Sequence, residues 1–186
     1  MGEGGFLLHS EEKLRRAIWS QLTQAVTDRS HAWRTPVLAN VDEQGEPQAR
    51  TVVLRAVLEQ HQRLVFYTDY RSPKAVALAA NPAAVLVFWS EALRWQLRVS
   101  VDARVETAGA TVDEAWESVR HTAAAADYLS TQAPGSPVYA ATGERAAQPA
   151  FGVIVASVRS IDWLELDRAG HRRAWLTADA FEWLLP

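Results

Sequence analysis

Residues 48–81, QARTVVLRAVLEQHQRLVFYTDYRSPKAVALAAN, decide the fold that the sequence predicts. They indicate a strand, a turn and a second strand, followed by a sharp entry into a short helix over 73–80. Ser72 carries the side chain of an N-cap residue, and Pro73 suits the first position of a helix. Asn81, which precedes a proline, ends the segment. The chain therefore passes here from paired strands into a helix with a defined first turn.

The start of this helix favours a bound anion, because its first backbone N–H groups are unpaired and the helix dipole is positive there. Lys74 lies in the first turn, where a cation is unfavourable for the helix itself, and Arg50 is expected on the neighbouring strand of the same hairpin. A phosphate held by both side chains would explain both positions. Alternatively, both are ordinary solvated charges beside a common Ser-Pro helix start. The spacing alone leaves both interpretations open.

The rest of the chain predicts a mainly β domain, closer to an α+β barrel than to alternating β-α-β units. Ser10 begins a helix over 10–28 in which apolar residues recur at helical spacing. Residues 94–106 alternate most clearly between apolar and polar side chains. Residues 83–90 form an apolar run, as expected of a strand buried on both faces. A capping box at 111–114 opens another helix. The predicted strands are 37–42, 48–58, 63–69, 83–90, 94–106, 151–160, 161–167, 171–177 and 181–186, and the later helical segments are 73–80, 111–120 and 122–129.

Length and composition limit the classes of protein and site. The 186 residues fit one domain at 10–186, with a helix at 10–28 and a barrel over 36–186, after a flexible, glycine-rich segment at 1–9. The net charge of −3 argues against a general nucleic-acid-binding protein. The absence of cysteine excludes disulfides and thiolate sites, and the five histidines lack metal-ligand spacing, so no metal site is expected. No stretch approaches the roughly 20 apolar residues of a membrane span, so a cytoplasmic protein is expected.

Four motifs of this chain resemble the FMN-binding motifs of the pyridoxamine 5'-phosphate oxidase family. They are RTVVLR at 50–55, YT at 67–68, SPK at 72–74 and Gln96 after Phe-Trp. Their order and spacing agree with that family across residues 36–106. The resemblance implies an FMN-binding split β-barrel, α+β but mainly β with flanking helices. It also implies a homodimer with FMN at the subunit interface.

The resemblance assigns the FMN phosphate to one group of residues. Arg50 and Lys74 would hold the phosphate, and Ser72 or Thr68 would add hydroxyl donors. Pro73 stands where the family usually has an arginine, so one phosphate-binding cation is missing.

The flavin ring would meet a second group of residues. The backbone of 52–55 and the side chain of Tyr67 would line the ring, and Gln96 would contact it. Gln132 and Arg173 would come from the second subunit, and Trp163 would correspond to a C-terminal flavin-contacting tryptophan. The implied cofactor-binding residues are Arg50, Thr51, Val52, Val53, Leu54, Arg55, Tyr67, Thr68, Ser72, Lys74, Gln96, Gln132, Trp163 and Arg173.

The substrate side departs further from the family. Family enzymes bind the phosphate of their vitamin substrate through a lysine, a tyrosine, an arginine and a serine, with an Arg-any-His stretch near the C-terminus. Here Arg55 stands at the lysine position and Trp116 at the tyrosine position. Arg120 matches the arginine, and residues 169–171 read Ala-Gly-His, which keeps only His171. Because a charge-assisted hydrogen bond contributes about 1.5–3 kcal/mol, these changes predict weak or absent turnover of the vitamin phosphate.

These observations favour an FMN-dependent oxidoreductase acting on a small-molecule substrate that the sequence does not identify. A flavin supplies the redox step itself, which fits the absence of a Ser-His-Asp, Cys-His or paired-carboxylate pattern. The alternatives are a flavin-binding protein without catalysis, a related split barrel that uses deazaflavin or haem, and a structural or interaction barrel.

Overall fold

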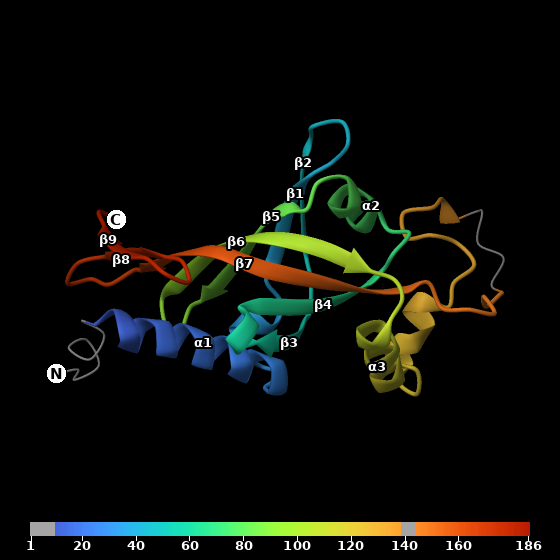
Figure 1. Ribbon diagram of the computed structural model, residues 1–186, viewed down its shortest axis with the longest axis horizontal. Coiled ribbons are helices and arrows are strands. Elements are labelled where there is room, and N and C mark those ends of the chain that lie inside the picture. Colours follow the sequence, from blue (N-terminus) through green and yellow to red (C-terminus); the bar gives the residue numbers. More distant parts are fainter. Residues whose placement is uncertain (1–9, 139–143) are drawn as a thin grey trace.

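The computed structural model describes residues 10–138 and 144–186, so the predicted flexible segment 1–9 lies outside the described residues. The strands are β1 (Val37–Val41), β2 (Pro47–Thr51), β3 (Leu54–Leu58), β4 (Arg63–Asp69), β5 (Ala83–Ser90), β6 (Trp95–Glu106), β7 (Phe151–Glu165), β8 (Arg172–Leu176) and β9 (Phe181–Leu184). The helices are α1 (Glu11–Thr27), α2 (Pro73–Ala80) and α3 (Ala110–Val119), with 3₁₀ turns η1 (Ala32–Arg34), η2 (Glu59–His61) and η3 (Ala123–Tyr128). All strands join one antiparallel sheet in the order β2-β1-β5-β6-β7-β4-β3, and β8 and β9 continue from β7 (Figure 1).

The two edge strands of this order, β2 and β3, are neighbours in the sequence. β2 pairs with β1 and β3 pairs with β4, yet only Val52 and Val53 separate the two strands. The sheet therefore curves until its edges meet, which makes a barrel that is split between β2 and β3. The N–H of Val52 donates to the carbonyl of Pro36 at 3.0 Å, just before the chain enters β1. The mainly β barrel is confirmed, but the single strand predicted over 48–58 is wrong.

Strand β7 runs unbroken where the sequence indicates two strands, 151–160 and 161–167. Its first half pairs with β4 and its second half with β8, while β6 lies along its whole length. The predicted break is a β-bulge: Val101 pairs with Val158 and Ser100 with Ser160, which leaves Arg159 as the extra residue. A bulge of this kind bends a strand without ending it.

Strand β5 is buried on one face only, so the prediction of a strand buried on both faces is wrong. Leu86 and Phe88 are fully buried, whereas Val85 and Val87 on the other face are partly exposed and Trp89 is 41% exposed. An apolar run does not reveal whether anything covers its second face. The alternation predicted for β6 is confirmed, with its apolar face in the core.

Helix α1 covers the core face of the barrel. Ser10 is its N-cap, as predicted, and its hydroxyl accepts from the N–H of Lys13 at 3.4 Å. The apolar stripe of α1 is buried in the same cluster as Trp33, whose ring meets Phe88 and Trp95 edge-on or tilted. No helix in the described part of the chain is long and apolar enough to cross a membrane.

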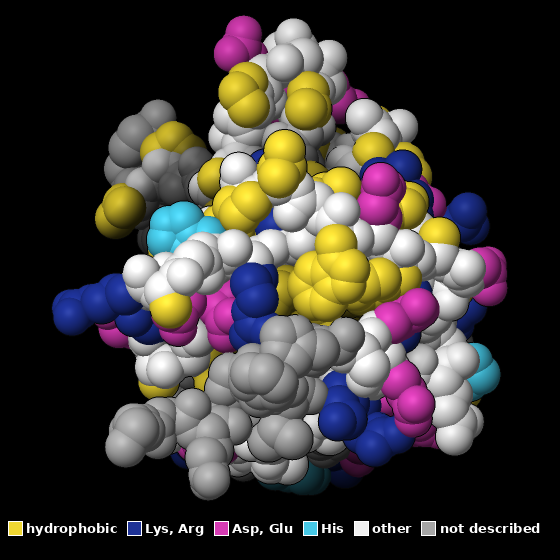
Figure 2. Space-filling view, turned by 90° about the vertical axis from the view of Figure 1, so that its left-hand side faces the viewer, with side chains coloured by type: hydrophobic (Ala, Val, Ile, Leu, Met, Phe, Trp, Pro, Cys, Tyr) yellow, Lys and Arg dark blue, Asp and Glu magenta, His cyan; other side chains and the backbone are white. Residues whose placement is uncertain are grey.

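Helix α3 and turn η3 form a second cluster at the end of the sheet opposite β8 and β9 (Figure 1). The predicted capping box at 111–114 is wrong, because Gly109 is the N-cap and no side chain caps this helix. Gly109 has φ 101°, a left-handed angle that glycine adopts without strain. At the other end, Trp183 in β9 and Leu185 just after it are exposed. Figure 2 shows hydrophobic side chains gathered at this end among charged ones.

The one-sided burial of β5 can be tested with neighbouring substitutions. Leu86→Ala should lower the free energy of unfolding by about 2–5 kcal/mol, because it leaves a cavity in the core. Val85→Ala on the partly exposed face should cost clearly less. Urea unfolding of the dilute, monomeric protein, followed by tryptophan fluorescence, measures both losses. Equal losses would mean that another part of the same chain covers the second face of β5.

Candidate functional site

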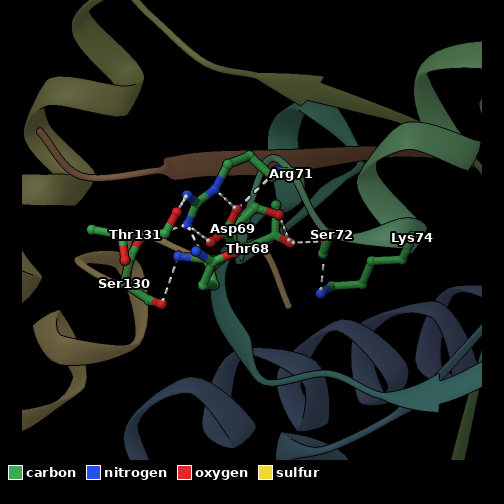
Figure 3. A network of polar contacts seen from close by, with 8 residues as sticks. Thr68, Asp69, Arg71, Ser72, Lys74, Ser130 and Thr131 are labelled. Atoms are coloured by element: carbon green, nitrogen blue, oxygen red, sulfur yellow. Dashed lines mark hydrogen bonds and ion pairs between the residues drawn. The ribbon is translucent and has the colours of Figure 1, made fainter. Parts of the chain in front are cut away.

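The start of α2 gathers hydroxyl groups and a lysine. Thr68 and Ser72 are buried, and their hydroxyl oxygens lie 3.2 Å apart. The Lys74 ammonium donates to the Ser72 hydroxyl at 3.2 Å (Figure 3). Ser72 is the N-cap residue, as predicted, but its side chain makes no capping hydrogen bond. Its hydroxyl instead joins Thr68 to Lys74.

Arg50 reaches the same region from β2. It pairs with Leu38 of β1, and its guanidinium donates to the Leu38 carbonyl at 3.4 Å and to the Asn40 side-chain oxygen. Asn40 is only 5% exposed, so this polar partner is part of the interior. Because Asn40 is neutral, it orients the arginine without cancelling its charge.

Arg50 and Lys74 are close enough to repel each other. Burial lowers the pKa of Lys74 first, and the positive charge of Arg50 lowers it further, while Asp69 partly opposes this shift. Burial also lowers the pKa of Arg50. Two partly buried cations that destabilise each other's charge would be relieved by a bound anion. The structure thus brings together the four residues that the sequence assigns to a phosphate.

The predicted ring-contacting residues lie elsewhere, on the outer face of the sheet. Gln96 pairs with Leu164 of β7, and Leu164 pairs with Arg173 of β8. Paired residues share a face, so Gln96 and Arg173 flank Leu164 about 10 Å apart. Trp163 points to the opposite face, where it is fully buried and its ring centroid lies 5.3 Å from that of Trp95. The prediction that Trp163 contacts a flavin is wrong, since one residue along a strand reverses the face.

Arg173 is held by an aspartate. Its Nε and Nη2 donate to the Asp162 carboxylate at 2.9 and 2.7 Å, and Arg98 donates to the same carboxylate at 2.5 Å. Hydrogen bonds from Arg173 chiefly lower the pKa of Asp162, and the bond to Asp162 raises the pKa of Arg173. Two guanidinium groups share one carboxylate, so this cluster keeps a net positive charge.

Arg55 lies in a separate cavity of about 570 Å³ between α1, β3, β4 and α3. Its guanidinium lies over the Tyr67 ring, 5.3 Å from the centroid, and its buried Nε has no hydrogen-bond partner among the described residues. Arg34 lines the same cavity and donates to the Val26 carbonyl at the end of α1, at 2.7 Å. The cavity is lined by Val26, Arg29, Arg34, Leu54, Arg55, Tyr67, Ser118, Val119, Thr122, Ala123 and Ala124, a set that contains arginines and no acidic residue.

The other predicted substrate residues do not join Arg55. Trp116 packs against Phe151 at 5.3 Å between ring centroids, as part of the cluster under α3. Arg120 pairs with Glu117 at 3.0 Å. His171 lies in the turn between β7 and β8, at the opposite end of the molecule (Figure 1). Of the substrate set implied by the resemblance, Arg55 alone is among the described residues that line this cavity.

The motif 50–55 divides between the two regions. Thr51 ends β2 and is exposed, whereas Val52 and Leu54 are buried in the core and Val53 is partly buried. The motif therefore contributes Arg50 to the region at the start of α2, and Leu54 and Arg55 to the cavity between α1 and α3.

Gln132 lies beside the α2 turn of its own chain. The carbonyl of Gln132 accepts from the Arg71 guanidinium at 3.3 Å. Asp69 holds that guanidinium (Figure 3). The contribution of Gln132 to a flavin site of a second subunit stays a prediction. Sequence reasoning missed Asn40, Asp69 and Arg71. The signal for Asn40 was a polar residue at an inward position of β1, and for Asp69 and Arg71 it was their spacing of two residues beside the SPK motif.

Comparison with known proteins decides the family. A family model described as "Pyridoxamine 5'-phosphate oxidase, FMN-binding domain" matches residues 16–107. The chain belongs to the pyridoxamine 5'-phosphate oxidase-like family of FMN-binding split barrels. The pyridoxine/pyridoxamine 5'-phosphate oxidase of Chromohalobacter salexigens is 44% identical over 79 residues, 42% of this chain and 35% of that protein. The Thermobifida fusca enzyme of the same name is 42% identical over 84 residues, 39% of this chain and 37% of that protein. The matches thus span little more than a third of these relatives' length.

Solved structures of family members share the fold over most of the chain. A pyridoxamine 5'-phosphate oxidase-related, FMN-binding protein from Nostoc punctiforme has a TM-score of 0.73 at 22% identity, and covers 92% of this chain and 97% of its own. PhzG from Burkholderia lata, in complex with tetrahydrophenazine-1-carboxylic acid, has a TM-score of 0.75 at 16% identity, with 92% and 91% covered. Identities this low show the split-barrel fold and nothing about ligands.

The strained charge of Lys74 predicts a pH-dependent stability. Because the pKa of Lys74 is lower in the folded chain, the unfolded chain holds the proton more firmly. The charged lysine therefore lowers the free energy of unfolding, and this loss is complete at pH values below the folded-state pKa. The cost disappears as the pH rises toward the ordinary value of about 10.4. Lys74→Met should therefore be more stable than the wild type at pH 7 without ligand, and this advantage should shrink toward pH 10.

Urea unfolding of both proteins from pH 7 to 10 measures this difference. Lys13→Met, on the exposed side of α1, is the matched control and should show no such trend. A difference that stays constant over the whole pH range would contradict the buried charge at Lys74.

Proposed function

We propose that this chain binds FMN through a phosphate site at the start of α2 and acts as an FMN-dependent oxidoreductase on a small molecule. The observation that carries the proposal is the convergence of Arg50 and Lys74, partly buried and mutually repelling, beside the hydroxyl groups of Thr68 and Ser72. A phosphate there would receive charge-assisted hydrogen bonds and would neutralise the repulsion. The donor set therefore fits the family's cofactor even though Pro73 removes one cation.

The remaining residues would orient the flavin and exclude water from it. The flavin, when bound, would supply the redox chemistry. Gln96 would offer a side-chain amide to the ring, and Arg173, fixed by Asp162, would hold positive charge on the same face of the sheet. These residues lie on the outer face, whereas the phosphate site lies at the start of α2, so a ligand reaching both needs a second copy of the chain.

A homodimer is the arrangement that we propose for this purpose. The outer face of β1 and β5 offers apolar side chains for the contact, including the partly exposed Val85 and Val87 and the 41% exposed Val41 and Trp89. Apolar side chains that gather on a surface are typical of association sites. A second chain covering this face would bury the side of β5 that is open in one chain.

The cavity around Arg55 is the proposed place for the small-molecule substrate. Its lining has three arginines, an aromatic ring and apolar walls, so it suits a molecule with an anionic group. Arg29 and Arg34 come from the segment after α1 and do not belong to the substrate set that the resemblance implies. The substrate therefore need not be pyridoxine or pyridoxamine phosphate.

The second candidate is a flavin-binding protein without catalysis of its own. The scattering of Trp116, Arg120 and His171 favours it, because no complete substrate set faces a single site. Rapid turnover of bound flavin with any pair of reductant and oxidant would exclude this candidate. Mass spectrometry of the cofactor released on denaturation separates FMN from deazaflavin and haem.

Removal of Lys74 provides the direct test of FMN binding. Lys74→Met should weaken FMN binding about 10- to 150-fold, since a charge-assisted hydrogen bond contributes about 1.5–3 kcal/mol. Titration of the ligand-free protein with FMN, followed by quenching of flavin fluorescence, measures the affinity. Lys13→Met should bind like the wild type. Failure of the wild type to bind FMN, or equal affinity for Lys74→Met, would overturn the proposed phosphate site.

Turnover of the vitamin phosphate should be weak. We expect the FMN-loaded protein to form pyridoxal phosphate from pyridoxamine phosphate with a kcat/KM at least about tenfold below that of the Chromohalobacter salexigens relative, because at least one phosphate contact is missing. The two proteins are compared in one oxygen-dependent assay. Equal kcat/KM values would contradict this prediction and would indicate that the cavity around Arg55 binds the phosphate of pyridoxamine phosphate as well as the relative does.

A further inference from the structure

Arg71 and Asp69 form a clamp at the end of β4. Arg71 donates from Nε and Nη2 to the two carboxylate oxygens of Asp69 at 3.1 and 2.7 Å, and its backbone N–H donates to the same carboxylate at 2.8 Å. Asp69 is 5% exposed. A buried carboxylate with three donors from one residue holds that residue's side chain in a single orientation.

The other side of the guanidinium holds a loop from a distant part of the sequence. Nη2 donates to the carbonyl of Ser130 at 3.0 Å and to that of Gln132 at 3.3 Å, and Nη1 donates to the carbonyl of Thr131 at 3.3 Å (Figure 3). Three successive backbone carbonyls thus converge on one side chain. A lysine could not match this arrangement, because it lacks the planar fork of donors.

The clamped loop stands next to the proposed phosphate site. Pro134 lines a cavity of about 350 Å³ together with Arg50, Arg71 and Pro73. Asp69 also contributes to the electrostatic field at Lys74. The position of the loop relative to the start of α2 therefore depends on Arg71.

We infer that Arg71 is a positioning residue for the FMN site, which fixes residues 130–134 against the α2 turn so that the cofactor is enclosed between the loop and Lys74. The inference rests on the proposed function for its effect on FMN, whereas the clamp itself consists of protein groups alone. Arg71 is unsuited to bind the phosphate directly, because Asp69 neutralises it and most of its donors already bind Asp69 or the loop carbonyls. The hydrogen bond to Asp69 also raises the pKa of Arg71, so the guanidinium stays charged.

Three variants test the inference. Arg71→Met should raise amide hydrogen exchange in residues 129–136 of the ligand-free protein and speed FMN dissociation about tenfold or more. Arg71→Lys keeps a charge for Asp69 but cannot hold three carbonyls, so it should restore the thermal stability and only part of the FMN retention. Asp69→Asn/Arg71→Met also removes the buried carboxylate charge. Its loop should exchange as fast as in Arg71→Met, but its thermal stability should fall less than in Arg71→Met alone.

Arg16→Met is the matched control, because Arg16 makes one exposed ion pair with Glu12 on α1. It should change neither the exchange of the loop nor FMN dissociation. Unchanged exchange in Arg71→Met would overturn the clamp. A loosened loop with unchanged FMN dissociation in all variants would overturn the positioning role. If the wild type binds no FMN, the proposed function fails, and the hydrogen-exchange result still decides the clamp.

Discussion

The two-residue link between β2 and β3 is the constraint on which the rest of the structure depends. Val52 and Val53 join the opposite edges of a sheet that is otherwise built in the order β2-β1-β5-β6-β7-β4-β3, so the sheet has to close. The link also separates two arginines. Arg50 before it faces the start of α2, and Arg55 after it faces the cavity beneath α1 and α3. One short segment thus supplies both candidate ligand-binding regions.

Local signals predicted most of the elements. The start of α2 followed from Ser72 and Pro73, because caps and turns act within a few residues. The approach of Arg50 to Lys74 was expected from a hairpin, but β2 pairs with β1 and not with β3 or β4, so closure of the sheet is what brings the two cations together. The resemblance to the family then named the ligand that the pattern alone left open.

Local signals could not predict which face of a strand is buried or how distant strands close into a barrel. Trp163 and Leu164 differ by one position, which is enough to exchange core and surface, and no local pattern in an apolar strand reveals that difference. The sequence of β5 likewise does not show that one of its two apolar faces is left open in a single chain. Arg34 and Arg55 line the same cavity because α1, which precedes Arg34, packs against β3. Their proximity is therefore set by tertiary structure alone.

The hydrogen-bond and ion-pair partners of each cation distinguish structural from ligand-binding roles. Arg71 is matched by a buried carboxylate and three carbonyls, so it contributes to the folded state and needs nothing further. Arg50 has a neutral amide and a carbonyl as partners, and Lys74 has a hydroxyl, so their charges remain and burial makes each one costly. Folding stability does not explain such a cost, because apolar side chains would stabilise the same positions better. A bound anion would replace the water that burial removes from these two cations, and so would offset the cost of their charges. Arg71, which Asp69 already neutralises, would hold the loop beside them.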